Sequence, residues 1–391
     1  MDYKLIPTEH LDQVVKLKDY CFVKRHEADH MDDIVPWLEI GAGLGGYDGK
    51  QLASQLLIHP LEMNVFGHLY PMGGIAMVST YPEYRQGGVT KGLLQAAFKK
   101  MKKDGQILSV LSPFSIGFYR HFGYEVFFEN SNYSIPVEKM ALRQEASGRV
   151  VRFDYESDKC DDWLPKIKAF HQTIVEQTNG YMVRDDKWWN RLRLREPFDH
   201  FGVSVNQSGE VDGYVRYVWN KPQLEITDFH AANGHAIRVL WQYIQSHQSQ
   251  VSTVVGKSPV DDSLAFHLKE PVFERSGFYD MMIRIVDVEA FLKDYPFKKR
   301  HQPLYVSIED PHADWNQAVF KIDTDGRVTK VLAVQDEKLL KMAIGPFSAM
   351  MSGYHSLDWY RQFGYAEVTD QQAKYWQAAI PYGNPRFNDF F

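Results

Sequence analysis

The sequence contains only two cysteines, Cys21 and Cys160, which lie far apart and form no CxxC pair. They cannot build a metal cage together, and we expect each to be an ordinary buried or surface thiol. The chain also lacks a run of about 20 apolar residues, the length needed to span a bilayer. Its first residues, Met1 to Lys4, lack the apolar core of a signal peptide. These absences predict a cytoplasmic protein with no membrane partner.

A dense run of lysine or arginine is absent too, and the formal net charge is −6. The chain therefore offers no positive surface for a phosphate backbone, which argues against nucleic acid as a partner. Apolar residues are abundant: 44% of the chain is hydrophobic and 14% is aromatic, which excludes a disordered or fibrous protein. The length of 391 residues predicts about two or three domains.

The first third of the chain carries a clear order of elements. Residues 43–59 alternate around Asp48-Gly49, a dipeptide that favours a hairpin turn. An apolar strand at 73–80, an amphipathic helix at about 88–102 and a strand at 107–111 follow. A strand, a helix and a second strand predict a βαβ unit with parallel pairing.

The same order returns in the middle of the chain, with a strand at 224–229, a helix at 235–247 and a strand at 251–255. The segment Arg275 to Phe278 looks like a counterpart of Arg120 to Tyr124, which closes the first unit. We therefore expect the middle domain to be a degenerate copy of the first.

A third region begins near residue 287 with an apolar and acidic helix at 288–292, and it contains a turn at 323–326. It is typical of a smaller α+β domain. The predicted fold class is α+β, with three domains: 1–140, 141–286 and 287–391.

The strongest chemical signal is the segment from Val78 to Thr90, which lies between the predicted strand and helix. Backbone N–H groups at a helix start favour a pyrophosphate, since they are unpaired and the helix dipole adds positive charge. Gly87 and Gly88 would let that backbone approach phosphates without a Cβ in the way. An ordinary strand-to-helix turn is the alternative.

This segment resembles the acetyl-CoA loop of GNAT enzymes, written Gln/Arg-x-x-Gly-x-Gly/Ala, which Arg85 and Gly88 match. Thr90 departs from the last position of that motif. The segment Phe118 to Tyr124 stands where GNAT enzymes carry a tyrosine beside the thiol of coenzyme A. A second GNAT-like region and a C-terminal region similar to sterol carrier proteins extend the resemblance to the Eis (enhanced intracellular survival) acetyltransferases, over essentially the whole chain.

The resemblance implies roles for particular residues. It places the pantetheine of acetyl-CoA on the strand Val78 to Thr80 and the pyrophosphate on the loop Arg85 to Val89. It makes Tyr119 the general acid and the terminal carboxylate of Phe391 the general base, and it implies a homohexamer. The predicted cofactor-binding residues are Val78, Ser79, Thr80, Arg85, Gln86, Gly87, Gly88, Val89 and Thr90.

The reaction itself makes these roles chemically sensible. Attack of an amine on a thioester develops an oxyanion and expels a thiolate, so a site needs N–H donors and an acid. A phenol with a pKa near 10 carries its proton at neutral pH, although Tyr119 could instead be a packing residue. The tail from Ile380 to Phe391 is rich in aromatic rings and prolines, which predicts that it docks in a cleft. A tail packed on the surface is the alternative.

Four other patterns are set aside. His26 to His30 matches HExxH, but its charged surroundings indicate a solvated helix face, so we expect no metal. Gly41 to Gly46 matches GxGxxG, yet a hairpin and not a helix follows, which predicts a flexible loop. Tyr360 to Tyr365 repeats the letters around Tyr119 and predicts a helix that ends at Gly364. The pair Trp188-Trp189 is typical of packing.

The predicted function is transfer of an acetyl group from acetyl-CoA to an amine, since the family's acceptors include aminoglycosides, polyamines and protein lysines. Phe22 and Trp37 could line a pocket for a cationic substrate with the carboxylates of Glu27, Asp32 and Asp33. Ordinary surface charge or core packing explains each of these residues equally well. A lipid-binding carrier with non-catalytic GNAT scaffolds is a rival function, and a zinc hydrolase is a third.

Overall fold

The computed structural model of the chain describes residues 1–22, 38, 41–85, 87–332, 334–335 and 338–391. These residues form two compact units. The first unit comprises Met1–Phe128, Thr178–Val183 and Met281–Phe391, and the second comprises Glu129–Gln177 and Arg184–Asp280. Within the part of the chain so described, no helix is long and apolar enough to cross a membrane.

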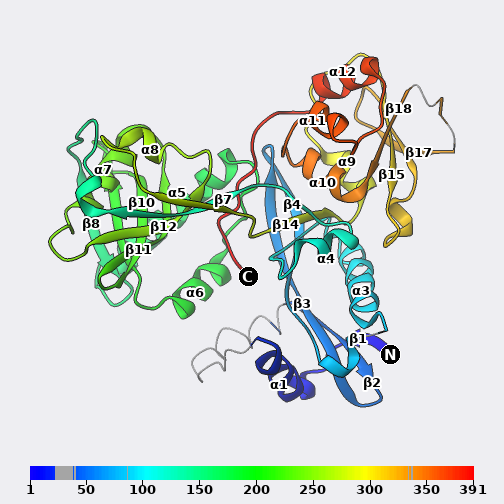
Figure 1. The fold of residues 1–391 in the computed structure, drawn as a ribbon, viewed down its shortest axis with the longest axis horizontal. Coiled ribbons are helices and arrows are strands. Elements are labelled where there is room, and N and C mark those ends of the chain that lie inside the picture. The colour runs from blue at the N-terminus through cyan, green and yellow to red at the C-terminus, as the bar shows by residue number, and fades with distance from the viewer. Residues whose placement is uncertain (23–37, 39–40, 86, 333, 336–337) are drawn as a thin grey trace. The chain divides into compact units, whose positions relative to one another are not determined.

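The first unit begins with a mixed sheet (Figure 1). In spatial order its described strands are β1 (Asp2–Leu5), β2 (Ala42–Asp48), β3 (Gln51–Val65), β4 (His68–Thr80), β5 (Leu108–Leu111), β14 (Met282–Ile285) and β6 (Glu125–Val126). The helices beside them are α1 (Leu11–Phe22), α3 (Val89–Lys103) and α4 (Ile116–His121), with short 3-10 turns at Thr8–His10 and Pro82–Tyr84.

The predicted hairpin and βαβ unit are confirmed. β2 and β3 pair antiparallel around Gly49, whose φ of 59° is the left-handed conformation that glycine adopts without strain. β4 and β5 pair parallel across α3. α3 buries Leu94 and Phe98 against the sheet, in a cluster that also contains Ile58 and Ile75. α1 packs Val14 and Leu17 into a separate cluster with Tyr47, Leu52 and Met77.

The expected flexible loop at Gly41 to Gly46 is wrong, because these glycines lie mostly in β2, which pairs with both β1 and β3. Neighbouring side chains leave no room for a Cβ at Gly45 and Gly46. A Cβ at Gly45 would lie 2.5 Å from a methyl carbon of Leu52, and one at Gly46 would lie 2.5 Å from the Ser54 hydroxyl. Close packing therefore selects glycine in a regular strand.

The second unit contains its own mixed sheet. Its described strands, in spatial order, are β13 (Glu274–Phe278), β7 (Asn130–Pro136), β12 (Thr253–Pro259), β11 (Gln223–Ala231), β10 (Val211–Asn220), β9 (His200–Val205) and β8 (Arg149–Asp154). Its helices are α5 (Cys160–Gln177), α6 (Asp186–Arg195), α7 (Gly234–Gln245) and α8 (Leu264–His267), with a 3-10 turn at Val137–Lys139.

The predicted repeat holds in its core and fails at its end. β11, α7 and β12 repeat the order of β4, α3 and β5, again with parallel pairing. Trp188 and Trp189 of α6 are buried, as predicted for packing residues. The expected likeness between Arg275–Phe278 and the Tyr119 segment is wrong, because the former is strand β13 while the latter is helix α4. Strand pairing with β7 decides that local structure.

Each sheet also receives a strand from a distant part of the sequence. β14 lies between β5 and β6 of the first sheet, and β7 lies between β13 and β12 of the second. β7 therefore follows the first sheet in sequence but pairs in the second, and β14 follows the second and pairs in the first.

The C-terminal region of the first unit is a smaller α+β structure, as predicted. Its described sheet has the order β17 (Val328–Val331), β16 (Val319–Ile322), β15 (Leu304–Glu309) and β18 (Leu339–Ala343). Its helices are α9 (Val288–Asp294), α10 (Ile344–Met351), α11 (Leu357–Gln362) and α12 (Asp370–Ala379), with a 3-10 turn at Asp314–Asn316. Gly364 follows α11 with a φ of 78°, which confirms the predicted helix end.

A buried polar network stabilises the second unit around Asp228 of β11. The Asp228 carboxylate accepts hydrogen bonds from Arg184 at 2.5 Å and from the Tyr214 hydroxyl at 3.0 Å. Because that hydroxyl donates to Asp228, it can accept the Nδ1 hydrogen of His171, 2.9 Å away. Burial, assisted by the charge of Arg184, lowers the pKa of His171 well below its ordinary value. His171 is therefore neutral in the folded protein.

This network predicts that the second unit loses stability in mild acid. Below the ordinary pKa of 6.5, an unfolded chain protonates His171 whereas the folded chain does not. The free energy of unfolding therefore decreases as the pH is lowered through this range. We expect a loss of about 1 kcal/mol between about pH 7.5 and about pH 5.5. Urea unfolding followed by tryptophan fluorescence measures it, since the Trp189 ring lies 5.4 Å from His171. The variant His171→Gln should show a smaller pH dependence, and an unchanged slope would contradict the assignment.

Candidate active site

The sheet of the first unit opens where β4 and β5 separate. The two strands pair from Met72 with Leu108 to Ile75 with Leu111, and there the pairing ends. β4 continues to Thr80, and among the described strands only β3, on its other side, pairs with that continuation. Backbone N–H and C=O groups on the β5 side of residues 76–80 are thus available to an extended ligand.

A bulge in β4 marks the same point. The register with β3 shifts between Gln55 and Leu57, so that residues 77 and 78 oppose one residue of β3. Met77 has a φ of 55°, a conformation that non-glycine residues rarely adopt. The bulge turns β4 away from the line of β5, and it re-aims the strand edge that carries Val78, Ser79 and Thr80.

The predicted phosphate loop follows directly. Arg85 is exposed, and its Nε donates to the Thr80 carbonyl at 3.2 Å. Gly87 and Gly88 have φ values of 110° and 77°, and a Cβ at either would meet nothing within 4 Å. Gly88 is the N-cap of α3, so it offers no side chain to the first N–H groups of the helix. The Thr90 hydroxyl lies 3.4 Å from that of Thr80, at the end of β4.

The corresponding helix of the second unit has a closed start. Asn233 is the N-cap of α7, and its side-chain oxygen accepts hydrogen bonds from the N–H groups of His235 and Ala236 at 2.9 and 3.0 Å. Those donors are satisfied within the protein, whereas the start of α3 has only a glycine at the same position. The two helix starts therefore differ in their capacity to bind an anion.

Tyr119 lies on α4, which begins at the N-cap Ser115 just after β5. Its side chain is only 2% exposed and belongs to the same buried cluster as Ile75 of β4. Phe114 and Phe118 pack against its ring, with centroids 5.5 and 5.1 Å away. Burial raises the pKa of Tyr119 above its ordinary value, so the phenol keeps its proton.

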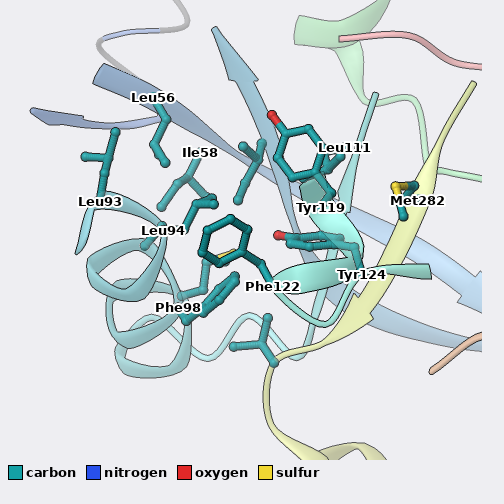
Figure 2. Packing of buried hydrophobic residues seen from close by; sticks show 14 of the residues in the cluster. Leu56, Ile58, Leu93, Leu94, Phe98, Leu111, Tyr119, Phe122, Tyr124 and Met282 are labelled. Atoms are coloured by element: carbon teal, nitrogen blue, oxygen red, sulfur yellow. The ribbon is translucent and has the colours of Figure 1, made fainter. Parts of the chain in front are cut away.

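The Tyr119 ring lies at one edge of this cluster, with its hydroxyl directed away from Phe98 and Phe122 (Figure 2). By contrast, the hydroxyl of the neighbouring Tyr124 is 2.7 Å from that of Ser109. Among the described residues, none is a hydrogen-bond partner of the Tyr119 hydroxyl. A phenol that is buried by its ring and unpaired at its oxygen is suited to donate to a bound molecule.

The C-terminal tail is docked in the first unit. Asn179 receives it, since its backbone carbonyl accepts from the N–H of Arg386 and its side chain donates to the carbonyl of Gly383 at 3.1 Å. Asn388 donates to the Tyr181 hydroxyl at 2.7 Å. The last residue, Phe391, is only 7% exposed. These contacts and this burial agree with the predicted docking of the tail.

Phe391 reaches the place where β4 and β5 separate. A Cβ at Gly74 would lie 2.9 Å from the Phe391 ring, and His59 of β3 lies edge-on to it at 6.0 Å between centroids. Gly74 is next to Ile75, and successive residues of a strand face opposite sides of a sheet. Tyr119, clustered with Ile75, and Phe391, against Gly74, thus approach the separation from the two faces.

Several predicted residues lie outside the described part of the chain. These are Gln86, Trp37 and the acidic residues Glu27, Asp32 and Asp33, together with both histidines of the HExxH match. Phe22 is described, at the end of α1 with 48% of its surface exposed. Tyr20, which the sequence analysis did not select, is 58% exposed and packs edge-on against Tyr81, directly after β4.

Met77, His59 and the receiving residue Asn179 are not among the residues predicted from the sequence. Nothing local in the sequence marks them. One signal was present, since Gly73-Gly74 interrupts an apolar strand, and glycine in a strand indicates a close approach by another group. Gly74 is where the Phe391 ring makes that approach.

Comparisons with known proteins agree with this architecture. Residues 2–127 match a model of the GNAT acetyltransferase domain, residues 180–285 match a second such model, and residues 288–388 match the sterol carrier protein domain. The expected order of two GNAT-like domains and a sterol-carrier-like domain is confirmed. No curated protein matches the chain significantly.

Solved structures share the fold over the whole chain. A probable N-acyltransferase from Enterococcus faecalis V583 is 24% identical, with a TM-score of 0.89, covering 100% of this chain and 99% of its own. A GCN5-related N-acetyltransferase from Anabaena variabilis is 23% identical, with a TM-score of 0.87 and 100% of both chains covered. Eis1 from Mycobacterium abscessus is 18% identical, with a TM-score of 0.82 and 100% of both chains covered.

The loop geometry predicts that Gly88→Glu abolishes acetyl-CoA binding, because it places a side chain and a negative charge at the start of α3. Gly105→Glu is the matched control. Gly105 has a nearly equal φ of 75°, and a Cβ there also meets nothing within 4 Å, but it lies beyond the other end of α3. Calorimetric titration should show binding by Gly105→Glu alone. Equal affinity of the two folded variants would remove the loop from the cofactor site.

Proposed function

We propose that this chain, which belongs to the GNAT acetyltransferases and carries two GNAT domains followed by a sterol carrier protein domain, transfers the acetyl group of acetyl-CoA to a primary amine of a cationic acceptor. One observation carries the proposal: the free edge of β4 runs between an uncapped helix start and a buried tyrosine with an unpaired hydroxyl. The first GNAT domain is the catalytic one, because Asn233 caps the corresponding helix of the second.

The residues of β4 and its loop would hold acetyl-CoA, which supplies the activated acetyl group. The unpaired edge of Val78 to Thr80 suits the two amides of a pantetheine arm, in the manner of an added strand. The loop from Arg85 through Gly87 and Gly88 to Thr90 suits the pyrophosphate, through backbone N–H groups and one arginine. A backbone N–H on the same edge stabilises the negative charge that develops on the carbonyl oxygen.

Tyr119 acts as the general acid in this proposal. A thioester carbonyl attacked by an amine releases a thiolate, and the phenol donates its proton to that sulfur. Its raised pKa keeps the proton in place until the reaction develops charge on the sulfur. No described residue pairs with this hydroxyl, which supports the role, since a packing tyrosine whose ring is buried to this degree ordinarily pairs its oxygen within the protein.

Phe391 acts as the general base in this proposal, through its α-carboxylate. An ammonium group has no lone pair, so the acceptor amine must lose a proton before it attacks. An α-carboxyl has an ordinary pKa of about 3.5, so at neutral pH it is ionised and has a lone pair that can accept this proton. Phe391 is buried beside Gly74 and His59, which supports the role.

The acceptor is cationic in this proposal, an aminoglycoside, a polyamine or a lysine side chain. The net charge of −6 favours approach of a cation. Tyr20 and Phe22 expose aromatic rings at the end of α1, with Tyr20 against Tyr81 at the end of β4, and aromatic faces attract ammonium groups. Release of free thiol from acetyl-CoA with kanamycin, spermidine and a lysine peptide tests the class. Activity with neutral or anionic amines alone would exclude it.

Two further proposals concern context: a cytoplasmic location, from the sequence features described above, and a homohexamer, from the family resemblance. Mass photometry of the purified protein tests the second. A monomer at working concentrations would exclude it.

Replacing Tyr119 by phenylalanine should lower kcat roughly a hundredfold or more with little change in acetyl-CoA affinity, because only the acidic proton is removed. Tyr360→Phe is the matched control. Tyr360 lies in the similar segment of α11, is also buried, and donates to the carbonyl of Tyr354 at 2.7 Å. The control should lose stability and keep kcat. Wild-type turnover in Tyr119→Phe would show that the ring only packs.

Two changes at the C-terminus test the base. Deletion of Phe391 removes the ring and moves the carboxylate, whereas extension by Gly-Ser-Gly keeps every side chain and moves only the carboxylate. Both should lose most activity while acetyl-CoA binding survives, since neither touches the loop before α3. The same extension at Met1, which is 50% exposed, is the control and should be silent. Full activity of the C-terminal extension would eliminate the carboxylate from catalysis.

A further inference from the structure

The C-terminal end of α4, the helix that carries Tyr119, is held by a fully buried arginine. Arg284 of β14 donates from Nη1 to the carbonyl of Phe122 at 2.6 Å. Its Nη2 donates to both oxygens of Asp310, which follows β15 in the sterol carrier domain, at 2.8 and 2.6 Å. Both partners of this ion pair have 0% side-chain exposure. One guanidinium therefore joins the catalytic helix to the next domain.

The surroundings of Arg284 leave it one orientation. Asn316 donates to Asp310 at 2.9 Å and fixes the carboxylate, while its own oxygen accepts from the N–H of Val288 at 2.9 Å. The guanidinium carbon lies 4.3 Å from the centre of the Phe98 ring. Gly123 has a φ of 76°, and any Cβ there would collide with Arg284. The second residue after α4 is thus a glycine, because its φ is positive and the arginine occupies the space of a Cβ.

A second side chain, His312 of the sterol carrier domain, contacts the carbonyl of His121 at the end of α4. His312 lies 2.7 Å through Nε2 from the carbonyl oxygen of His121, and because a carbonyl only accepts, Nε2 carries the hydrogen. The imidazole also packs on Phe122, with 5.1 Å between centroids. The last carbonyls of a helix lack partners inside it, so these two side chains satisfy groups that would otherwise need water. A guanidinium is also favoured there by the helix dipole.

The held end of α4 is tied to the β4 strand as well. The N–H of Tyr124 donates to the carbonyl of Tyr119 at 3.2 Å. The Tyr124 hydroxyl meets that of Ser109 at 2.7 Å, and Ser109 donates to the carbonyl of Gly73 at 3.0 Å. Gly73 precedes Gly74, where the Phe391 ring lies. These hydrogen bonds therefore connect Asp310, through the end of α4, to Gly73 of β4, two residues before the pairing of β4 with β5 ends.

We propose that Arg284 is a positioning residue for the acetyl transfer reaction: clamped between Asp310 and the Phe122 carbonyl, it fixes α4 so that the Tyr119 hydroxyl points at the reacting sulfur. The inference rests on the proposed function and assigns the sterol carrier domain a part in catalysis through Asp310 and His312. Misplacement of a catalytic group by about 1 Å can cost on the order of a hundredfold in rate. A buried ion pair gains little net stability over apolar packing, so orientation is the more informative role to test here.

Arg284→Lys is the decisive variant, because lysine keeps the charge beside Asp310 but has no second planar N–H for the Phe122 carbonyl. We expect kcat to fall at least about tenfold, with unchanged affinity for acetyl-CoA. Arg216→Lys is the matched control. Arg216 is a buried strand arginine of the second unit, paired with Asp199. Comparable thermal destabilisation without loss of kcat is expected there.

A double-mutant cycle with Tyr119→Phe separates positioning from general loss of structure. If Arg284 acts through the phenol, Arg284→Lys adds little to the defect of Tyr119→Phe, whereas independent losses multiply. Multiplying losses, or an Arg284→Lys variant as active as Arg216→Lys, would overturn the proposal. Wild-type turnover in Tyr119→Phe alone would instead refute the proposed role of Tyr119, so the two failures are distinct.

His312 supplies a second pair of variants should Arg284→Lys fail to fold. His312→Gln retains a side-chain N–H that can reach the His121 carbonyl, whereas His312→Phe retains only a ring. Positioning predicts that kcat falls in His312→Phe and is rescued in His312→Gln, with acetyl-CoA affinity equal in both. Equal kcat in the two variants would overturn the participation of the sterol carrier domain.

Discussion

The parallel pairing between β4 and β5 stops at Ile75 and Leu111, and the rest of the site depends on that ending. If the strands stayed paired to Thr80, no backbone edge would be available to an extended ligand. The bulge at Met77 fixes the point where the pairing of β4 with β5 ends. A non-glycine residue keeps a left-handed conformation only where the surrounding structure holds it. α3, α4 and the C-terminal tail then converge on the opening from three separate parts of the sequence.

The two GNAT domains of the chain differ in the residue that caps the central helix. The first GNAT domain begins its central helix at Gly88, and the second begins it at Asn233. An asparagine satisfies the first N–H groups of the helix and stabilises the domain, whereas a glycine leaves them for a ligand. The second copy also fills the interior near β10 and β11 with the buried network around Asp228. In the second GNAT domain, N–H groups at the helix start are thus satisfied by a side chain of the protein itself.

Much of this fold could be predicted from the sequence, because each repeated element has its own local pattern. The hairpin at Gly49, the strand, helix and strand of each copy, and the end of α11 at Gly364 are all set by neighbouring residues. The turn with Gly87 and Gly88 before α3 belongs with them, since glycine and position in the βαβ unit define it, whereas its binding of a pyrophosphate stays a prediction.

What the sequence did not reveal depends on contacts across long distances. The glycines of β2 suggest a loop, and only the side chains packed around them require a strand. Arg284 stands in the apolar run Met281 to Val286, so its burial could have been suspected, but Asp310 as its partner could not. The exchange of β7 and β14 has no local signal at all, because strand pairing is satisfied by any suitable apolar partner. The exchange of β14 also determines when, during synthesis, the first sheet can be completed. A ribosome releases β1 through β6 long before it releases β14, so the first sheet has a vacant position until residue 285 has emerged. While about 150 further residues are made, β5 and β6 keep the strand edges that later pair with β14.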